Sequence, residues 1–179
     1  MNVLVGYASA HGSTAEIARF MGRLLEAYDV NVTVSPLSEI EDASGYDAFI
    51  IGSPIHAGMW LQAVSLFFER CGAQMVGKPA FLFITCIRVM EDDGLEHALQ
   101  YYVHYPTLEA VGITRDRIGV VAGKIDINAI NWDERWLLSS NYDGTEGSKL
   151  MNHDYRDWQA IAVWTHGVVK AMGVKPTLA

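Results

Sequence analysis

The stretch YASAHGST at residues 7–14 follows the apolar run VLV and combines hydroxyl side chains with a glycine and no acidic residue. Ser9, Ser13 and Thr14 are hydrogen-bond donors, and Gly12 lets the backbone approach a ligand closely. The unpaired N–H groups at the start of a helix carry a partial positive charge and bind phosphate. The stretch therefore predicts a site for a phosphate monoester between a first strand and the helix after it.

A structural reading of the same residues is that Ser13 or Thr14 only caps the helix, since serine and threonine are common N-cap residues. Glu16 then lies in the first helical turn, where an acidic side chain is favourable. Because three hydroxyl groups and Gly12 stand between residues 9 and 14, we favour phosphate binding. His11 has two open roles, as a donor to the phosphate or as a solvated loop residue.

Three later residues have side chains that could take part in proton transfer, thiol chemistry or stacking on a ligand. His56 titrates near neutral pH and could move a proton, although a loop histidine is more often structural. Cys86 would need a neighbouring cation to become a reactive thiolate, and Arg88 alone does not establish one, so we expect no redox role. Trp60 shares the helical spacing of Val64, and we favour a core position for it over stacking on a ligand.

Alternating strands and helices position these residues. Apolar, β-rich runs predict strands at residues 2–7, 30–35, 47–52, 80–86 and 118–123. Helices are predicted after residue 14, near 60–71, near 93–105 and from residue 158, and the third of them should turn inward Leu95, Leu99, Tyr102 and Val103. The alternation indicates parallel strands with right-handed crossovers, hence an open sheet covered by helices on both faces. Ligands of such sheets bind beyond the carboxyl ends of the strands.

The alternation ends after the fifth strand, in residues 124–149. A connection of this length is usually either functional or disordered, and we expect a short helix near 133–139. Acidic and basic residues are mixed in the segment, so it is not a basic anchor. Its apolar side chains either border a binding site for a hydrophobic substrate or pack against the edge of the sheet. These side chains are Trp132, Trp136, Leu137 and Leu138.

Composition narrows the classes of protein. The chain has 179 residues, 50% of them hydrophobic and 19% charged, which predicts one domain over residues 1–179. A net charge of −8 argues against nucleic acid as a partner. No apolar stretch reaches the roughly 18 residues of a membrane span, so we expect a cytoplasmic protein and leave peripheral membrane contact open. Cys71 and Cys86 form neither a disulfide framework nor a zinc motif, and no metal site is predicted.

Residues 7–18 resemble the flavodoxin signature, which wraps the phosphate of FMN, although Gly6 replaces the bulky apolar residue usual before the aromatic. Most of the chain is similar to the menaquinone-dependent protoporphyrinogen oxidase family, through GSPIHAG at 52–58, the insertion before the last helix and YRDW at 155–158. The resemblance implies a flavodoxin-like three-layer α/β sandwich. Its five-stranded parallel sheet would have the order 2-1-3-4-5, with an insertion between strand 5 and the last helix.

The resemblance also implies which residues hold FMN. Those expected around the phosphate are Ser9, Ala10, His11, Gly12, Ser13 and Thr14. Loops 53–60 and 85–89 should flank the flavin ring, with contacts from Ser53, Pro54, Ile55, His56, Ala57, Gly58, Thr85, Cys86 and Ile87. The flavin itself performs the redox chemistry, so few catalytic side chains are expected, and His56 is the one weak candidate.

The function implied is an FMN-dependent oxidoreductase that passes two electrons from an organic donor to a quinone-like acceptor. The alternative is a flavodoxin-type one-electron carrier between protein partners, which the acidic composition suits. A phosphoacceptor receiver domain is excluded, because Ser9 and Ser53 stand where that class needs acidic residues. The residues leave open whether the partner is a quinone or a redox protein, and whether the chain forms a homodimer.

Overall fold

Five parallel strands form the central sheet of the computed structural model, which describes residues 1–141 and 152–177, with the backbone alone for 137–141. The strands are β1 (Asn2–Tyr7), β2 (Asn31–Pro36), β3 (Ala48–His56), β5 (Ala80–Thr85) and β6 (Ile118–Val121). They pair in the order β2-β1-β3-β5-β6, and every one of these pairs is parallel. The predicted order 2-1-3-4-5 is therefore confirmed.

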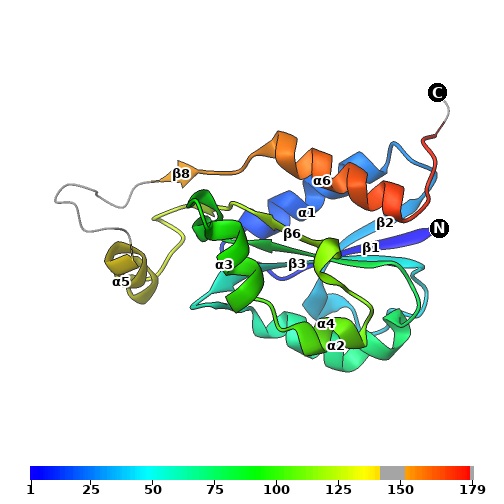
Figure 1. The fold of residues 1–179 in the computed structure, drawn as a ribbon, viewed down its shortest axis with the longest axis horizontal. Coiled ribbons are helices and arrows are strands. Elements are labelled where there is room, and N and C mark those ends of the chain that lie inside the picture. The colour runs from blue at the N-terminus through cyan, green and yellow to red at the C-terminus, as the bar shows by residue number, and fades with distance from the viewer. Residues whose placement is uncertain (142–151, 178–179) are drawn as a thin grey trace.

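Helices cover both faces of the sheet and complete a three-layer sandwich (Figure 1). On one face lie α1 (Ser13–Leu25) and α6 (Trp158–Ala171), and on the other lie α2 (Gln62–Met75), α3 (Gly94–Tyr101) and α4 (Tyr105–Ala110). Short 3-10 turns occur at Leu37–Glu39, Ile87–Met90 and Arg115–Arg117. The fold class expected from the sequence is thus the one observed.

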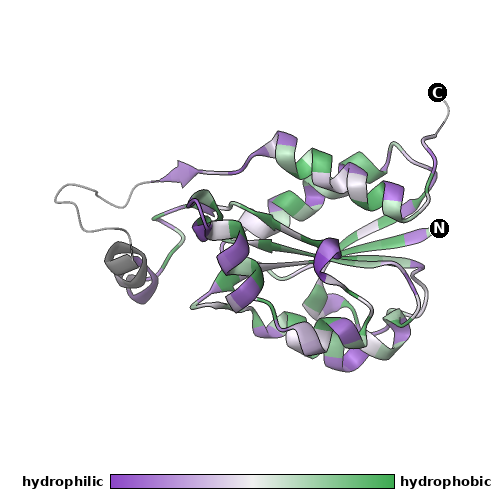
Figure 2. Ribbon diagram, in the orientation of Figure 1, coloured by the Kyte–Doolittle hydropathy of each residue, from purple (hydrophilic) through white to green (hydrophobic). Residues whose placement is uncertain are grey.

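The core lies on both sides of the central strands. Residues 3–5, 48–51 and 80–84 are almost completely buried, as expected for central parallel strands covered on both faces. One apolar cluster packs under α2 to α4, and the other packs under α1 and α6. Figure 2 shows the hydrophobic residues gathered along the strands and the hydrophilic ones on the outer sides of the helices.

The helix predicted near 93–105 ends early, as α3 at Tyr101, and a separate helix, α4, begins at Tyr105; Leu95 is 52% exposed rather than turned inward. Leu99 and Val103 are buried as predicted. The break has a simple cause, because Pro106 lies in the first turn of α4. A proline ring inside a continuous helix would clash with the carbonyl four residues earlier, so α3 ends before it.

The third strand is longer than predicted and turns back on itself. After Gly52 the chain continues as β3 to His56, and β4 (Met59–Trp60) pairs with it in antiparallel fashion. The two turn residues, Ala57 and Gly58, have φ of 48° and 78°, as a tight hairpin requires. Trp60 belongs to this hairpin and not to α2, but its indole N–H donates to Ser65 Oγ (2.9 Å) beside the core.

The insertion after β6 begins and ends in a small ladder. β7 (Lys124–Ile125) pairs with β8 (His153–Asp154), and α5 (Trp132–Asn141) lies between them in sequence, so the short predicted helix is confirmed. Figure 1 shows α5 beyond the carboxyl ends of the strands. The side chains of Leu137 and Leu138 fall outside the described part of the chain. None of the described helices is long and apolar enough to cross a membrane.

Candidate functional site

A cavity of about 500 Å³ lies where the loops after the parallel strands converge. Of the sequence-predicted site residues, all but Gly12 and Ser53 line it, namely Ser9, Ala10, His11, Ser13, Thr14, Pro54, Ile55, His56, Ala57, Gly58, Thr85, Cys86 and Ile87. Ser53 is completely buried instead: its Oγ accepts from the N–H of Leu61 (3.0 Å) and donates to the carbonyl of Pro54 (2.9 Å). Ser53 therefore stabilises the β3–β4 hairpin through these two hydrogen bonds and does not face the cavity.

The loop before α1 holds its own shape through hydroxyl groups. Gly12 is the N-cap, with φ of 88°, and its N–H donates to Ser9 Oγ (3.1 Å). The first helical hydrogen bond is donated by Glu16, so the N–H groups of residues 13–15 precede it and have no helical acceptor. No side chain caps α1, so the capping alternative for Ser13 and Thr14 is wrong.

Both residues instead join the loop to neighbouring elements. Ser13 Oγ accepts from the N–H of Lys124 (3.0 Å), and Thr14 Oγ1 shares a hydrogen bond with Thr85 Oγ1 (3.0 Å). These contacts fix the start of α1 against the ends of β5 and β6. The result is a ring of hydroxyl groups and free helix N–H groups on one side of the cavity, which is suited to a phosphate.

The opposite side of the cavity is formed by the β3–β4 hairpin and the loop after β5. Burial raises the pKa of the Cys86 thiol, which keeps it protonated at neutral pH. Arg88 pairs with the carboxylates of Glu91 and Asp93 and is not an activating cation for the thiol. Both observations argue against an activated thiolate at Cys86.

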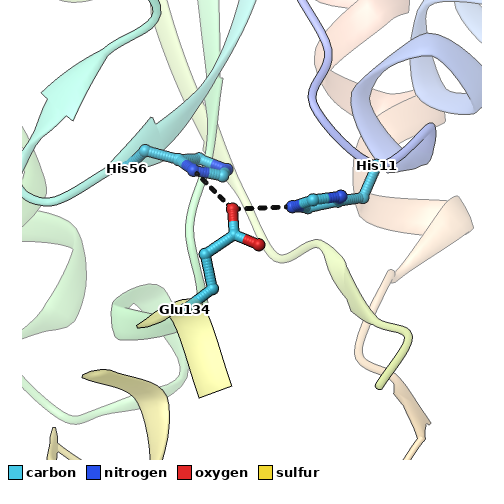
Figure 3. A group of neighbouring side chains, drawn as sticks. All are labelled: His11, His56 and Glu134. Atoms are coloured by element: carbon cyan, nitrogen blue, oxygen red, sulfur yellow. Dashed lines mark hydrogen bonds and ion pairs between the residues drawn. The ribbon is translucent and has the colours of Figure 1, made fainter. Parts of the chain in front are cut away.

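Glu134 is the main site residue that sequence reasoning missed. Its Oε1 lies 2.8 Å from His11 Nε2 and 3.6 Å from His56 Nδ1, so one carboxylate oxygen meets two imidazoles at the rim of the cavity (Figure 3). Burial lowers the pKa of His56, against the effect of the Glu134 carboxylate. Burial acts to raise the pKa of Glu134, but the N–H of Asn131 and the His11 ring hold it below its usual value.

Lys124 and Tyr102 are further cavity residues that were not predicted as site residues, although Tyr102 was expected to face inward from its helix. Lys124 begins the insertion, and its Nζ lies 3.6 Å from Glu16 Oε1. Tyr102 follows α3 and faces the hairpin, since a Cβ built on Gly58 would lie 3.7 Å from its ring. Neither residue has a sequence signal for a binding role, because both reach the cavity only through the packing of elements that are distant in the chain.

Arg156 anchors the end of the insertion to the start of α1. Its guanidinium pairs with Glu16 (2.5 Å) and Asp154 (2.6 Å) and lies 4.5 Å from the ring of Trp158, with only 6% of the side chain exposed. The hydrogen bonds from Arg156 hold the pKa of Glu16 and of Asp154 below their usual values. The anchor therefore fixes the insertion beside the phosphate-binding loop.

We expect Arg156→Met to lower the free energy of unfolding at pH 7 by about 1–2 kcal/mol. Hydrogen bonds to charged groups contribute more than that when buried, but Glu16 and Asp154 are 44% and 45% exposed, so the value is discounted for solvent screening. Because both carboxyl pKa values are lowered, the contribution is present above their ordinary values and is lost as the pH falls through the lowered ones. Urea unfolding of both proteins should thus show a difference in stability at pH 7 that disappears as the two carboxyl groups become protonated in acid.

The control for this variant is Arg115→Met, because Arg115 makes a similar ion pair with Glu96 (2.6 Å) on the surface. Arg115 is 49% exposed and Glu96 68%, whereas Arg156 is 6% exposed, so the change should be clearly smaller. An equal loss of stability in the two variants would contradict an anchoring role for Arg156.

Comparisons with known proteins agree with this architecture. A family model described as a flavodoxin domain matches residues 4–151. Protoporphyrinogen IX dehydrogenase (quinone) of Escherichia coli strain K12 is 21% identical over 182 residues, which cover 99% of each chain. Among solved structures, a flavodoxin from the domain Archaea has a TM-score of 0.59 at 14% identity, over 97% of this chain and 99% of that one. Oxidised flavodoxin 1 from Bacillus cereus has a TM-score of 0.60 at 15% identity, over 95% and 98%.

Proposed function

We propose that this chain, which belongs to the flavodoxin domain family and takes FMN as its cofactor, is an oxidoreductase that moves two electrons from an organic donor to a quinone-like acceptor. The observation that carries the proposal is the position of the insertion. It adds Ile130 and Glu134 to the wall of the cavity. An enzyme encloses its small substrate in this way, whereas a carrier needs an open cofactor edge for its protein partner.

The residues of the cavity fit FMN. The N–H groups at the start of α1, with Ser9 beside them, suit the phosphate. The β3–β4 hairpin and the loop at 85–87 provide an apolar slot with backbone donors and acceptors for the ring. When bound, FMN supplies the electron-accepting chemistry. The protein orients it and excludes water.

A second cavity, of about 1070 Å³, supports a small-molecule reaction. It lies between the hairpin, α2 and α4, and Gly58 and Tyr102 line both cavities. Space of this size beside the proposed flavin site suits an organic donor or acceptor. The proposed reaction class is taken from the name of the relative protoporphyrinogen IX dehydrogenase (quinone), which is 21% identical over 99% of both chains.

The one-electron carrier is the second candidate. The net charge of −8 favours it, since a negative surface steers docking to basic redox proteins. In that case the insertion would have a docking role and not a catalytic one.

An anaerobic reductive titration of the FMN-loaded protein, followed by absorbance, separates the two candidates. We expect direct two-electron reduction, followed by rapid reoxidation by a soluble quinone. A large fraction of one-electron-reduced flavin, with no quinone turnover, would overturn the proposal in favour of the carrier.

A matched pair of variants tests the contribution of the insertion. Trp132 on α5 is 75% exposed, so Trp132→Ser should leave stability unchanged. Because Trp132 stands between Ile130 and Glu134, which both line the cavity, the variant should lower kcat/KM for the quinone several-fold. Val163→Ser, at an exposed position on α6, should leave quinone turnover unchanged. Equal quinone kinetics in both variants would argue against α5 as part of the substrate site.

A further inference from the structure

Three potential metal ligands meet at the rim of the cavity, from parts of the chain more than forty residues apart. They are His11 in the loop before α1, His56 at the end of β3 and Glu134 in α5 (Figure 3). One ligand atom from each lies within 4.8 Å of the other two. We propose that these three side chains form a binding site for a zinc ion at the rim of the proposed flavin site, with His11 contributed by the phosphate-binding loop itself.

The distances between the ligand atoms are close to those of a zinc site. Four ligands at bond lengths of about 2.0–2.1 Å around a tetrahedral ion lie about 3.3 Å from each other. Here Glu134 Oε1 lies 2.8 Å from His11 Nε2 and 3.6 Å from His56 Nδ1. These two separations fall on either side of the ideal value, and the ligand nitrogens of the two imidazoles lie within 4.8 Å of each other. An ion can be accommodated once side-chain rotation brings these nitrogens closer together.

The carboxylate is already oriented for this role. Glu134 Oε2 accepts from the N–H of Asn131 (2.8 Å), and the N–H of Glu134 donates to Asn131 Oδ1 (2.9 Å). This reciprocal pair is a capping box at the start of α5. The capping box fixes Oε2, so that Oε1 points toward the two imidazoles. Hydrogen bonds commonly orient metal ligands in this way.

The imidazoles are carried on well-defined backbone. His56 pairs with Met59 in the β3–β4 ladder, directly before the tight turn at Ala57 and Gly58. His11 precedes the N-cap Gly12 of α1, in the loop held by the hydrogen bond to Ser9. Side chains on such short, hydrogen-bonded segments can hold a fixed ligand geometry.

The donor set selects the class of ion. Two imidazole nitrogens and one carboxylate oxygen are typical of zinc sites that keep a fourth position open for water or substrate. Magnesium and calcium prefer all-oxygen sites. The nearest cationic side chains of the cavity are engaged elsewhere, Lys124 with Glu16 and Arg88 with Glu91, and do not neutralise Glu134. The three residues also line the cavity, so the open position of the ion would border the flavin site.

Competition with a chromophoric zinc chelator tests the site in the FMN-loaded protein. We expect one equivalent of Zn²⁺ to be retained per chain and Mg²⁺ not to compete. His11→Ala, His56→Ala and Glu134→Gln should each weaken Zn²⁺ binding at least about ten-fold. Co²⁺ in place of Zn²⁺ should give a visible absorption band, which is lost in the same variants.

The control is His166→Ala, which removes a histidine of α6 that hydrogen-bonds to Tyr28 outside the cluster. It should bind Zn²⁺ like the unchanged protein. Absence of saturable Zn²⁺ binding would overturn the proposal and leave the cluster as an ion pair that only closes the rim. Equal binding by all four variants would overturn it as well. Melting temperatures identify a variant that has not folded, and the readout does not depend on whether the chain is an enzyme or a carrier.

Discussion

Ser9→Asp is expected to weaken FMN binding at least about 100-fold while the fold is retained. Ser9 lines the cavity at the loop before α1, and its Oγ accepts from the N–H of Gly12. A carboxylate at this position repels a bound phosphate. Two unit charges about 4 Å apart interact by about 4 kcal/mol at an effective dielectric constant of 20, so even a partly screened pair exceeds 100-fold in affinity.

A second variant separates the effect of the negative charge on FMN binding from the effect of the changed side-chain shape. Aspartate and asparagine can both accept the Gly12 N–H in place of serine, since short side-chain oxygens form equivalent local turns. Ser9→Asn should therefore retain FMN within about ten-fold. Quenching of FMN fluorescence on titration with apoprotein gives both affinities. Equal affinities of the two variants would place the phosphate elsewhere in the cavity.

Thr14 is a less suitable position for the same test, although it belongs to the same predicted motif. Its side chain is 1% exposed and bonded to Thr85. An aspartate there would be buried next to a hydroxyl, and loss of FMN could reflect loss of the fold. Ser9 is partly exposed and avoids this ambiguity.

The sheet was predictable because its signals are local. Each central strand is a short apolar run between turn residues, and burial on both faces follows from that composition. The phosphate-binding loop was predictable for the same reason, since its hydroxyl groups and glycine are adjacent in sequence. The break between α3 and α4 could also have been predicted, because Pro106 cannot lie inside a continuous helix.

The His11, His56 and Glu134 cluster could not be predicted from the sequence. Its members stand far apart, and metal motifs are recognised by short spacing. Asn131 and Glu134 have the spacing of a capping box, which predicts the start of a helix but not the direction in which the free carboxylate oxygen points. That direction depends on how α5 packs at the cavity rim.

Gly94→Ala is expected to lower the free energy of unfolding by about 3 kcal/mol and to weaken FMN binding. Gly94 begins α3, and a Cβ there would lie 1.9 Å from the carbonyl oxygen of Arg88 and 2.8 Å from the Cα of Val89. Both contacts are backbone atoms, so α3 or the loop at 87–90 must shift. Overpacking of this kind costs about 1–3 kcal/mol and sometimes more. The helix propensity gained by alanine, at most about 1 kcal/mol, does not offset it.

The loop that must shift also lines the cavity, through Ile87 and Arg88, which is why the cofactor should be affected together with stability. Gly167→Ala is the matched control, since Gly167 lies inside α6 and a Cβ there meets nothing within 4 Å. It should stabilise the protein by about 0.5–1 kcal/mol and leave FMN affinity unchanged. Urea unfolding and FMN titration of both variants check these values. If Gly94→Ala were as stable as the unchanged protein, the close approach of α3 to the loop after β5 would be contradicted. The position of that loop in the wall of the cofactor cavity would then be wrong as well.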